Sequence, residues 1–145
     1  KTNGEVLWEK TNQGEQVVSP DKAAVLIGML RQTPISGTAK MAKEIALPRR
    51  VAGKTGTTND KKDAWFVGFN NESAVLVWIG FDDNTPHGLT GASAAVPVWM
   101  DIFSKLPIPK SDPLDQVEGV EKRVIPGILD YPPAELIFLK GSAPN

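Results

Sequence analysis

One nine-residue stretch, residues 50–58 (RVAGKTGTT), constrains the fold more than any other part of the sequence. Its valine and threonine residues favour extended backbone, and its two glycines leave space for another group to approach the backbone closely. Because alternate residues of a strand share a face, we expect Thr55 and Thr57 to point one way and Lys54 and Gly56 the other. The pattern predicts a strand whose exposed edge holds an anion.

Two further strands are predicted directly downstream, at residues 64–69 (AWFVGF) and 73–81 (SAVLVWIGF), and short polar turns join all three strands. Short turns connect antiparallel neighbours, so the three strands are expected to form a meander. The last strand is a nearly continuous apolar run, which is typical of a strand covered on both faces. We expect Trp65, Phe66 and Trp78 in the core; the alternative for Trp65 or Phe66 is a place on the wall of a cleft.

Helices are predicted before and after the meander. Ser19 is the expected N-cap of the first helix, because a proline and an acidic residue follow it. Apolar residues at positions 23, 26, 27 and 30 predict one buried stripe on this helix. Ser93 is the expected N-cap of a second helix, with positions 96, 100 and 103 on its buried stripe. Helices packed on an antiparallel sheet, a three-strand meander plus flanking strands, define an α+β fold.

The other segments carry shorter patterns. We expect a half-buried strand at residues 5–10, a short strand at 16–18, and one or two helical turns between residues 39 and 46. Prolines recur after residue 106. We therefore expect two portions: residues 1–106, which carry the meander, and residues 107–145, an extended Pro-rich tail whose one strand lies at 135–139.

The composition excludes several classes of function. The net charge is −1 and no basic block is present, so neither nucleic acid nor an anionic membrane surface is a favoured partner. No apolar run approaches the roughly 20 residues that span a bilayer. The chain has no cysteine and a single histidine, His87, so we expect neither a metal site nor a cofactor. It begins at Lys1 and not at methionine, and we expect it to be a piece of a longer protein.

Residues 52–69 (AGKTGTTNDKKDAWFVGF) resemble the third catalytic motif of penicillin-binding proteins, whose signature is Lys-Thr-Gly. Four other segments resemble the bifunctional class A members of this family in the same order: GTA at 37–39, VWIGFDD at 77–83, TGASAAVPVW at 90–99 and IFLKGSAPN at 137–145. The resemblance covers nearly the whole chain. It implies the C-terminal part of a class A transpeptidase domain, with the fold shared by penicillin-binding proteins and serine β-lactamases.

The resemblance also implies the chemistry. Such enzymes attack the D-alanyl-D-alanine bond of a peptidoglycan stem peptide with a serine, form an acyl-enzyme, and are targets of β-lactam antibiotics. Lys54 would be the cation of the cleft, and the Thr57 N–H one of two oxyanion-hole donors. The hydroxyls of Thr55 and Thr57 would bind the terminal carboxylate, while Gly56 would let the substrate pair with the strand edge. Thr58 would line the cleft or simply begin the turn.

Two other motifs of the family, Ser-x-x-Lys and Ser-x-Asn, are expected upstream of Lys-Thr-Gly. The one formal Ser-x-x-Lys is residues 19–22, where Ser19 is better explained as a helix cap, and no Ser-x-Asn exists. We therefore expect the missing motifs in an upstream part of the same protein, and this chain alone to be inactive. The resemblance implies an extracytoplasmic location, with attachment to the membrane through an N-terminal anchor outside this chain.

Several alternatives remain open from the sequence. A non-catalytic module could keep the fold and bind peptidoglycan or a β-lactam as a sensor or scaffold. A class A β-lactamase is disfavoured by the transpeptidase-like segments after Thr57. Lys54 has a structural alternative, an edge-strand lysine that blocks aggregation. Asp63 is interpreted as a turn residue, the Asp82–Asp83 pair as a solvated strand end, and His87 as structural or exposed.

Overall fold

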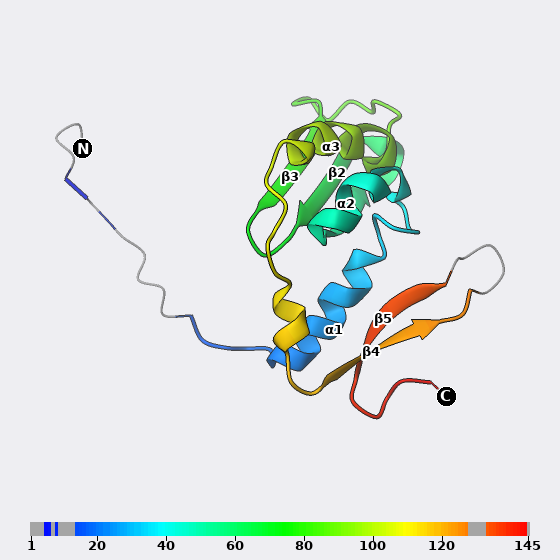
Figure 1. Cartoon of the computed structure of the whole chain (residues 1–145). Helices are drawn as coiled ribbons and strands as arrows, with labels where there is room; N and C mark the ends of the chain where they lie inside the picture. The colour runs from blue at the N-terminus through cyan, green and yellow to red at the C-terminus, as the bar shows by residue number, and fades with distance from the viewer. Residues whose placement is uncertain (1–4, 7, 9–13, 128–132, 145) are drawn as a thin grey trace.

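The computed structural model describes residues 5, 6, 8, 14–127 and 133–144. Within these ranges the chain forms two antiparallel sheets and three α-helices, joined by shorter helical turns (Figure 1). In chain order the elements are α1 (Pro20–Arg31), η1 (Lys40–Ala42), α2 (Lys43–Arg49), β1 (Ala52–Thr57), η2 (Asn59–Lys61), β2 (Asp63–Phe69), β3 (Ala74–Gly80), the π-helical turn η3 (Gly91–Ala95), α3 (Val96–Ser104), η4 (Pro113–Gln116), β4 (Val120–Ile125) and β5 (Ala134–Leu139).

The predicted meander is confirmed. The strand order is β1-β2-β3, and both pairings are antiparallel. Gly56 lies opposite Trp65, and Trp65 lies opposite Trp78. Because side chains alternate along each strand, one face of the sheet carries Lys54, Gly56 and these two tryptophans, and the other carries Thr55, Thr57 and Phe66. The α+β class is therefore confirmed as well.

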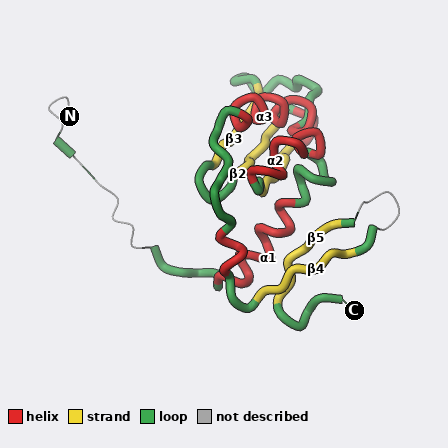
Figure 2. Tube along the Cα trace, viewed as in Figure 1, coloured by secondary structure: helices red, strands yellow, loops and turns green. Residues whose placement is uncertain are grey.

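The main core lies between the sheet and helices α2 and α3, which cover the same face (Figure 2). Trp99 of α3 is fully buried; its ring meets Phe66 edge-on at a centroid distance of 5.1 Å and stacks on Phe103 at 4.4 Å. Gly68 of β2 admits this ring, since a Cβ atom there would lie 2.5 Å from it. The large ring is accommodated because Gly68 has no side chain at the point where the ring meets β2.

The opposite face of the sheet is open at its centre. Trp65, Leu76 and Trp78 are 37%, 58% and 42% exposed. The prediction that β3 is covered on both faces is therefore wrong, as is the prediction that Trp65 and Trp78 are core residues. The physical reason is that α2 and α3 pack on one face only, while α1 reaches the other face only near Ala52 and Phe69.

A second, smaller core joins α1 to the C-terminal hairpin β4–β5. It contains Ala24, Leu114 and Ile137. The tail at residues 107–145 therefore holds two paired strands, not the single strand that was predicted. The predicted stripe on α1 is confirmed only in part: Ile27 packs against this core, but Leu26 is exposed and the fully buried positions are Ala24 and Gly28. The face of α1 that carries the small residues packs on β5, where a Cβ atom on Gly28 would lie 3.0 Å from Ile137.

The remaining local predictions have mixed outcomes. Ser19 is the N-cap residue of α1, as predicted. The second helical segment begins earlier than predicted: Thr90 is its N-cap, and Ser93 completes a reciprocal capping box. The predicted strand at 16–18 is wrong, because those residues form no strand. Most of the strand predicted at 5–10 lies outside the described residues; of its described members, Val6 and Trp8 are exposed and form no strand.

Candidate functional site

The candidate site is the free edge of β1, which pairs only with β2 within the described sheet. An edge strand leaves backbone N–H and C=O groups unpaired, so an extended ligand can add to it as a further strand. Lys54 is exposed on this strand, and its Nζ donates a hydrogen bond to the carbonyl oxygen of Thr55 at 2.8 Å. The strand therefore offers a cation and a row of backbone groups at one edge.

The two threonine hydroxyls of the motif lie on the helix-covered face and already have partners. Thr55 Oγ1 lies 2.7 Å from Thr38 Oγ1, and Thr57 Oγ1 accepts a hydrogen bond from the Gly91 N–H at 3.0 Å. These contacts hold the strand against the loop that precedes α2 and against η3. Thr55 is half-buried and Thr57 is exposed.

Gly91 explains how η3 approaches the motif so closely. A Cβ atom on Gly91 would lie 2.3 Å from the Trp65 carbonyl oxygen and 2.7 Å from the Gly56 carbonyl oxygen. Any larger residue would push η3 away from β1 and β2. Neither Gly91 nor Thr38 was singled out as a site residue, although both lie in segments used for the family resemblance. The sequence therefore marked both segments as typical of the family, but no pattern in it indicated that Thr38 and Gly91 contact Thr55 and Thr57.

Asp63 organises the turn that follows the motif. Thr58 donates its hydroxyl to Asp63 Oδ2 at 3.1 Å, and the Asp63 N–H donates to Thr58 Oγ1 at 2.9 Å. Trp78 Nε1 donates to Asp63 Oδ1 at 2.8 Å. Asp60 and Lys61 complete the turn with positive φ angles of 60° and 53°. These contacts agree with the interpretation of Asp63 as a turn residue and give Thr58 a part in the same turn.

Among the other candidate residues, His87 joins this turn through its backbone N–H, which donates to the Lys61 carbonyl oxygen at 3.2 Å. Ser19 occupies the N-cap position of α1, where its side chain makes no capping hydrogen bond, whereas residues of the C-terminal half of that helix approach the sheet. His87 Nδ1 accepts a hydrogen bond from the Leu89 N–H at 3.0 Å, and its ring contacts Phe81 edge-on. Asp83 is exposed, and hydrogen bonds from Thr85 hold the pKa of its carboxyl below the usual value.

Two properties of the described residues bear on partners. No group of three or more histidine, cysteine, aspartate or glutamate side chains in these ranges could hold a metal ion. No helix in the same ranges is long and apolar enough to cross a membrane. The arrangement is thus an α+β domain in which an edge strand presents Lys-Thr-Gly-Thr beside an open aromatic sheet face.

Comparisons with known proteins show which family has this kind of domain. The family described as penicillin binding protein transpeptidase domain matches residues 3–104. Penicillin-binding protein 1A of Aquifex aeolicus is 44% identical over 101 residues, and penicillin-binding protein 1B of Haemophilus influenzae is 36% identical over 107. These matches cover 68% and 74% of this chain, and in each case 14% of the relative. The chain therefore spans about one seventh of the length of these relatives.

The fold has a counterpart among solved structures. The crystal structure of penicillin-binding protein 1A from Haemophilus influenzae matches 89% of this chain and 22% of its own, with a TM-score of 0.64 and 23% sequence identity. At this identity the match concerns the fold alone. Together with the family match over residues 3–104, it leads to one conclusion: the chain belongs to the penicillin-binding protein transpeptidase family.

Proposed function

We propose that this chain supplies one wall of the active site of a peptidoglycan D,D-transpeptidase that forms a serine acyl-enzyme and is acylated by β-lactams. The observation that carries the proposal is the edge of β1 that no further strand of the described sheet pairs with, where the exposed Lys54 lies. A stem peptide ending in D-Ala-D-Ala would add to this edge as an extended strand, and Gly56 would allow its close approach.

Within this site Lys54 supplies positive charge near the substrate carboxylate and the proton-transfer groups. The Thr57 N–H serves as an oxyanion-hole donor, for which about 3–4 kcal/mol of transition-state stabilisation is typical. Thr55, Thr57 and Thr58 contact the substrate at its carboxylate end. The Thr38–Thr55 hydroxyl contact and the hydrogen bond from the Gly91 N–H to Thr57 Oγ1 support this assignment indirectly, because they hold the strand in place on its helix-covered face.

The nucleophile comes from an upstream part of the same protein in this proposal. The exposed aromatic face around Trp65, Leu76 and Trp78 supports it, since a contiguous apolar patch of this kind is typical of a surface that another polypeptide covers. The short span of this chain relative to its relatives leaves ample sequence for that part. The whole protein would then work on the outer side of the cytoplasmic membrane, where peptidoglycan lies, attached by an anchor outside this chain.

Labelling with fluorescent penicillin tests the proposal. The full-length protein is expected to be acylated and the 145-residue chain alone is not. Lys54→Ala in the full-length protein is expected to slow acylation on the order of a hundredfold, as is typical when one electrostatic group is removed from an active site. Lys61→Ala, in the neighbouring turn, is the matched control and is expected to label normally.

Two outcomes would count against the assignment. Labelling of the 145-residue chain alone would require a nucleophile within it, and Ser19 would then be reconsidered. Near-normal labelling of Lys54→Ala would remove Lys54 from the site. Saturable but non-covalent binding of penicillin by the full-length protein would favour the alternative function, a sensor or scaffold that binds peptidoglycan or β-lactam without turnover.

A further inference from the structure

A groove of about 510 Å³ lies between α1, α2 and the β4–β5 hairpin. Its volume falls in the range of about 300–1,000 Å³ that is usual for small-molecule sites. None of the Lys54 motif residues lines it. Four basic side chains on its wall face three acidic ones, namely Arg31, Lys43, Arg50 and Lys122 against Asp112, Asp115 and Glu135. The wall therefore carries an excess of positive charge in a chain whose net charge is −1.

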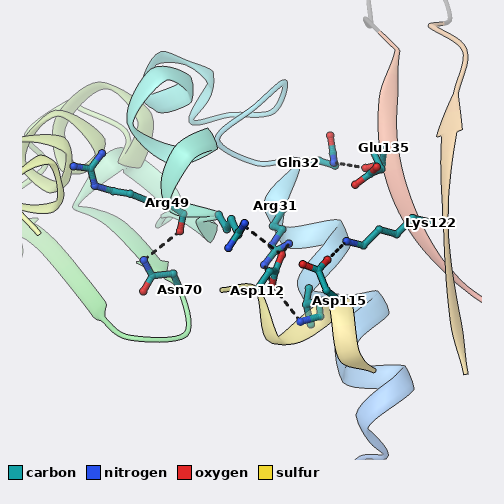
Figure 3. A network of polar contacts seen from close by, with 10 residues as sticks. Arg31, Gln32, Arg49, Asn70, Asp112, Asp115, Lys122 and Glu135 are labelled. Carbon is teal, nitrogen blue, oxygen red and sulfur yellow. Dashed lines mark hydrogen bonds and ion pairs between the residues drawn. The ribbon is translucent and has the colours of Figure 1, made fainter. Parts of the chain in front are cut away.

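Asp112 is the centre of this charge network and is only 6% exposed (Figure 3). Its two carboxylate oxygens accept hydrogen bonds from Arg31 Nη1 at 2.6 Å and Nη2 at 2.8 Å. Arg50 Nε lies 3.8 Å from the same carboxylate. Asp115, on the same wall, pairs with Lys122. The Asp112 carboxylate thus lies against two guanidinium groups, so this cluster of three side chains carries a net positive charge.

Three polar atoms on the groove wall are buried and have no hydrogen-bond partner among the described residues. They are Arg31 Nε, Arg50 Nη1 and Gln32 Oε1. Buried polar atoms in folded proteins nearly always have a partner. The two arginine atoms are charged donors that suit the oxygens of a carboxylate or a phosphate. The glutamine oxygen is an acceptor and suits a hydroxyl or an ammonium group.

We propose that this groove binds a small molecule through an oxyanion, a phosphate or carboxylate group, held between Arg31 and Arg50. A hydroxyl or ammonium group on the same molecule donates to Gln32 Oε1. Lys43, on the α2 side of the groove, adds a long-range attraction for the anion. The site shares no residue with the β1 edge, so the binding test below and the penicillin-labelling test above can fail separately.

Titration of the 145-residue chain with sodium phosphate and, separately, with sodium acetate tests the proposal. Sodium chloride keeps the ionic strength constant, and backbone amide NMR shifts report binding. Saturable shifts at residues 28–32 and at Arg50 are expected with at least one anion, and the comparison shows whether phosphate or carboxylate is preferred. Arg50→Gln is expected to weaken binding roughly ten- to a hundredfold, because it removes a charge-assisted hydrogen bond.

The controls separate the groove from general charge effects. Arg123→Gln, an exposed arginine on β4 outside the groove, is expected to leave the affinity unchanged. If Arg50→Gln unfolds the chain, Lys43→Gln carries the test, and it is expected to weaken binding by roughly three- to tenfold through its lost charge. The absence of saturable shifts with both anions, or equal weakening by Arg123→Gln and the folded groove variant, overturns the proposal.

Discussion

Replacement of Asp112 by asparagine tests how the C-terminal segment is held to α1. Asparagine keeps the size of the side chain and one oxygen that can accept the Leu114 N–H, which bonds Oδ1 at 3.1 Å. It removes the negative charge that Arg31 and Arg50 share. The substitution therefore isolates the ion pair from the cap of η4, and it leaves two guanidinium groups close together without a carboxylate.

The expected loss of stability follows from the burial of the Asp112 ion pair. Breaking a fully buried ion pair by removing one partner costs about 3–5 kcal/mol. The Arg31 and Arg50 side chains are 19% and 38% exposed, so water partly restores their solvation after the change. We therefore expect Asp112→Asn to lower the free energy of unfolding by about 2–4 kcal/mol. Asp115→Asn is the matched control; its pair with Lys122 is much more exposed and is worth less than about 1 kcal/mol.

The pH dependence gives a second readout. Burial by itself raises the pKa of Asp112, but the hydrogen bonds from Arg31 and Leu114 and the charges of Arg31 and Arg50 outweigh it, so the pKa lies below its usual value. A carboxyl whose folded pKa is depressed stabilises the fold fully above its unfolded pKa of about 3.9 and loses that contribution as pH falls through the folded pKa. The difference between wild type and Asp112→Asn is expected to be full at pH 7 and to shrink below about pH 4.

Urea denaturation, followed by tryptophan fluorescence at several pH values, measures these differences. With m values of about 1–3 kcal/mol/M, a loss of 3 kcal/mol moves the midpoint by roughly 1–3 M. A loss under about 1 kcal/mol at pH 7 would refute the reasoning, because the Arg31 pair would then behave like an exposed one. A difference that stays constant from pH 7 to pH 3 would show that the effect does not come from the charge of Asp112.

Two other substitutions test the packing and the helix start. Gly68→Ala is expected to destabilise the chain by about 1–3 kcal/mol, because the new Cβ atom would lie 2.5 Å from the buried Trp99 ring. Gly14→Ala, where a Cβ atom meets nothing within 4 Å, is the control, and equal urea midpoints for the two variants would contradict the packing argument. Thr90→Ala removes the capping box with Ser93 and is expected to lower the thermal stability by about 0.5–2 kcal/mol, whereas Thr90→Ser, which keeps the hydroxyl, is expected to retain most of it. Equal melting temperatures for the two Thr90 variants would show that the hydroxyl is not what stabilises this start.

The candidate site was predictable in part. The alternation along β1 correctly assigned Lys54 and Gly56 to one face and Thr55 and Thr57 to the other, because it depends only on strand geometry. The roles given to Lys54, Thr55, Gly56, Thr57 and Thr58 in binding and catalysis stay predictions. The bonds from Thr38 and Gly91 to the motif hydroxyls were not predicted, since Thr38 and Gly91 are 17 and 34 positions away from their partners and no local pattern links them.

The predictions that were wrong concern elements whose packing partners are distant in the sequence. Strand β4 was missed because the prolines around it favour irregular backbone, while its pairing with β5 is what makes it a strand. Leu26 has the hydrophobicity of a core residue, yet α1 packs on β5 through the smaller residues Ala24 and Gly28. Hydrophobicity identified what can be buried, but packing partners decided what is buried.

The sequence by itself determined the antiparallel meander, the start of α1 and the alternation of side chains on β1, because short turns, caps and a period of two are local properties of the chain. Only the tertiary structure decided which face of the sheet α2 and α3 cover. It also decided that Asp112 meets Arg31, 81 positions away. Such contacts depend on how whole elements pack against one another, and a residue's sequence neighbours do not specify that packing.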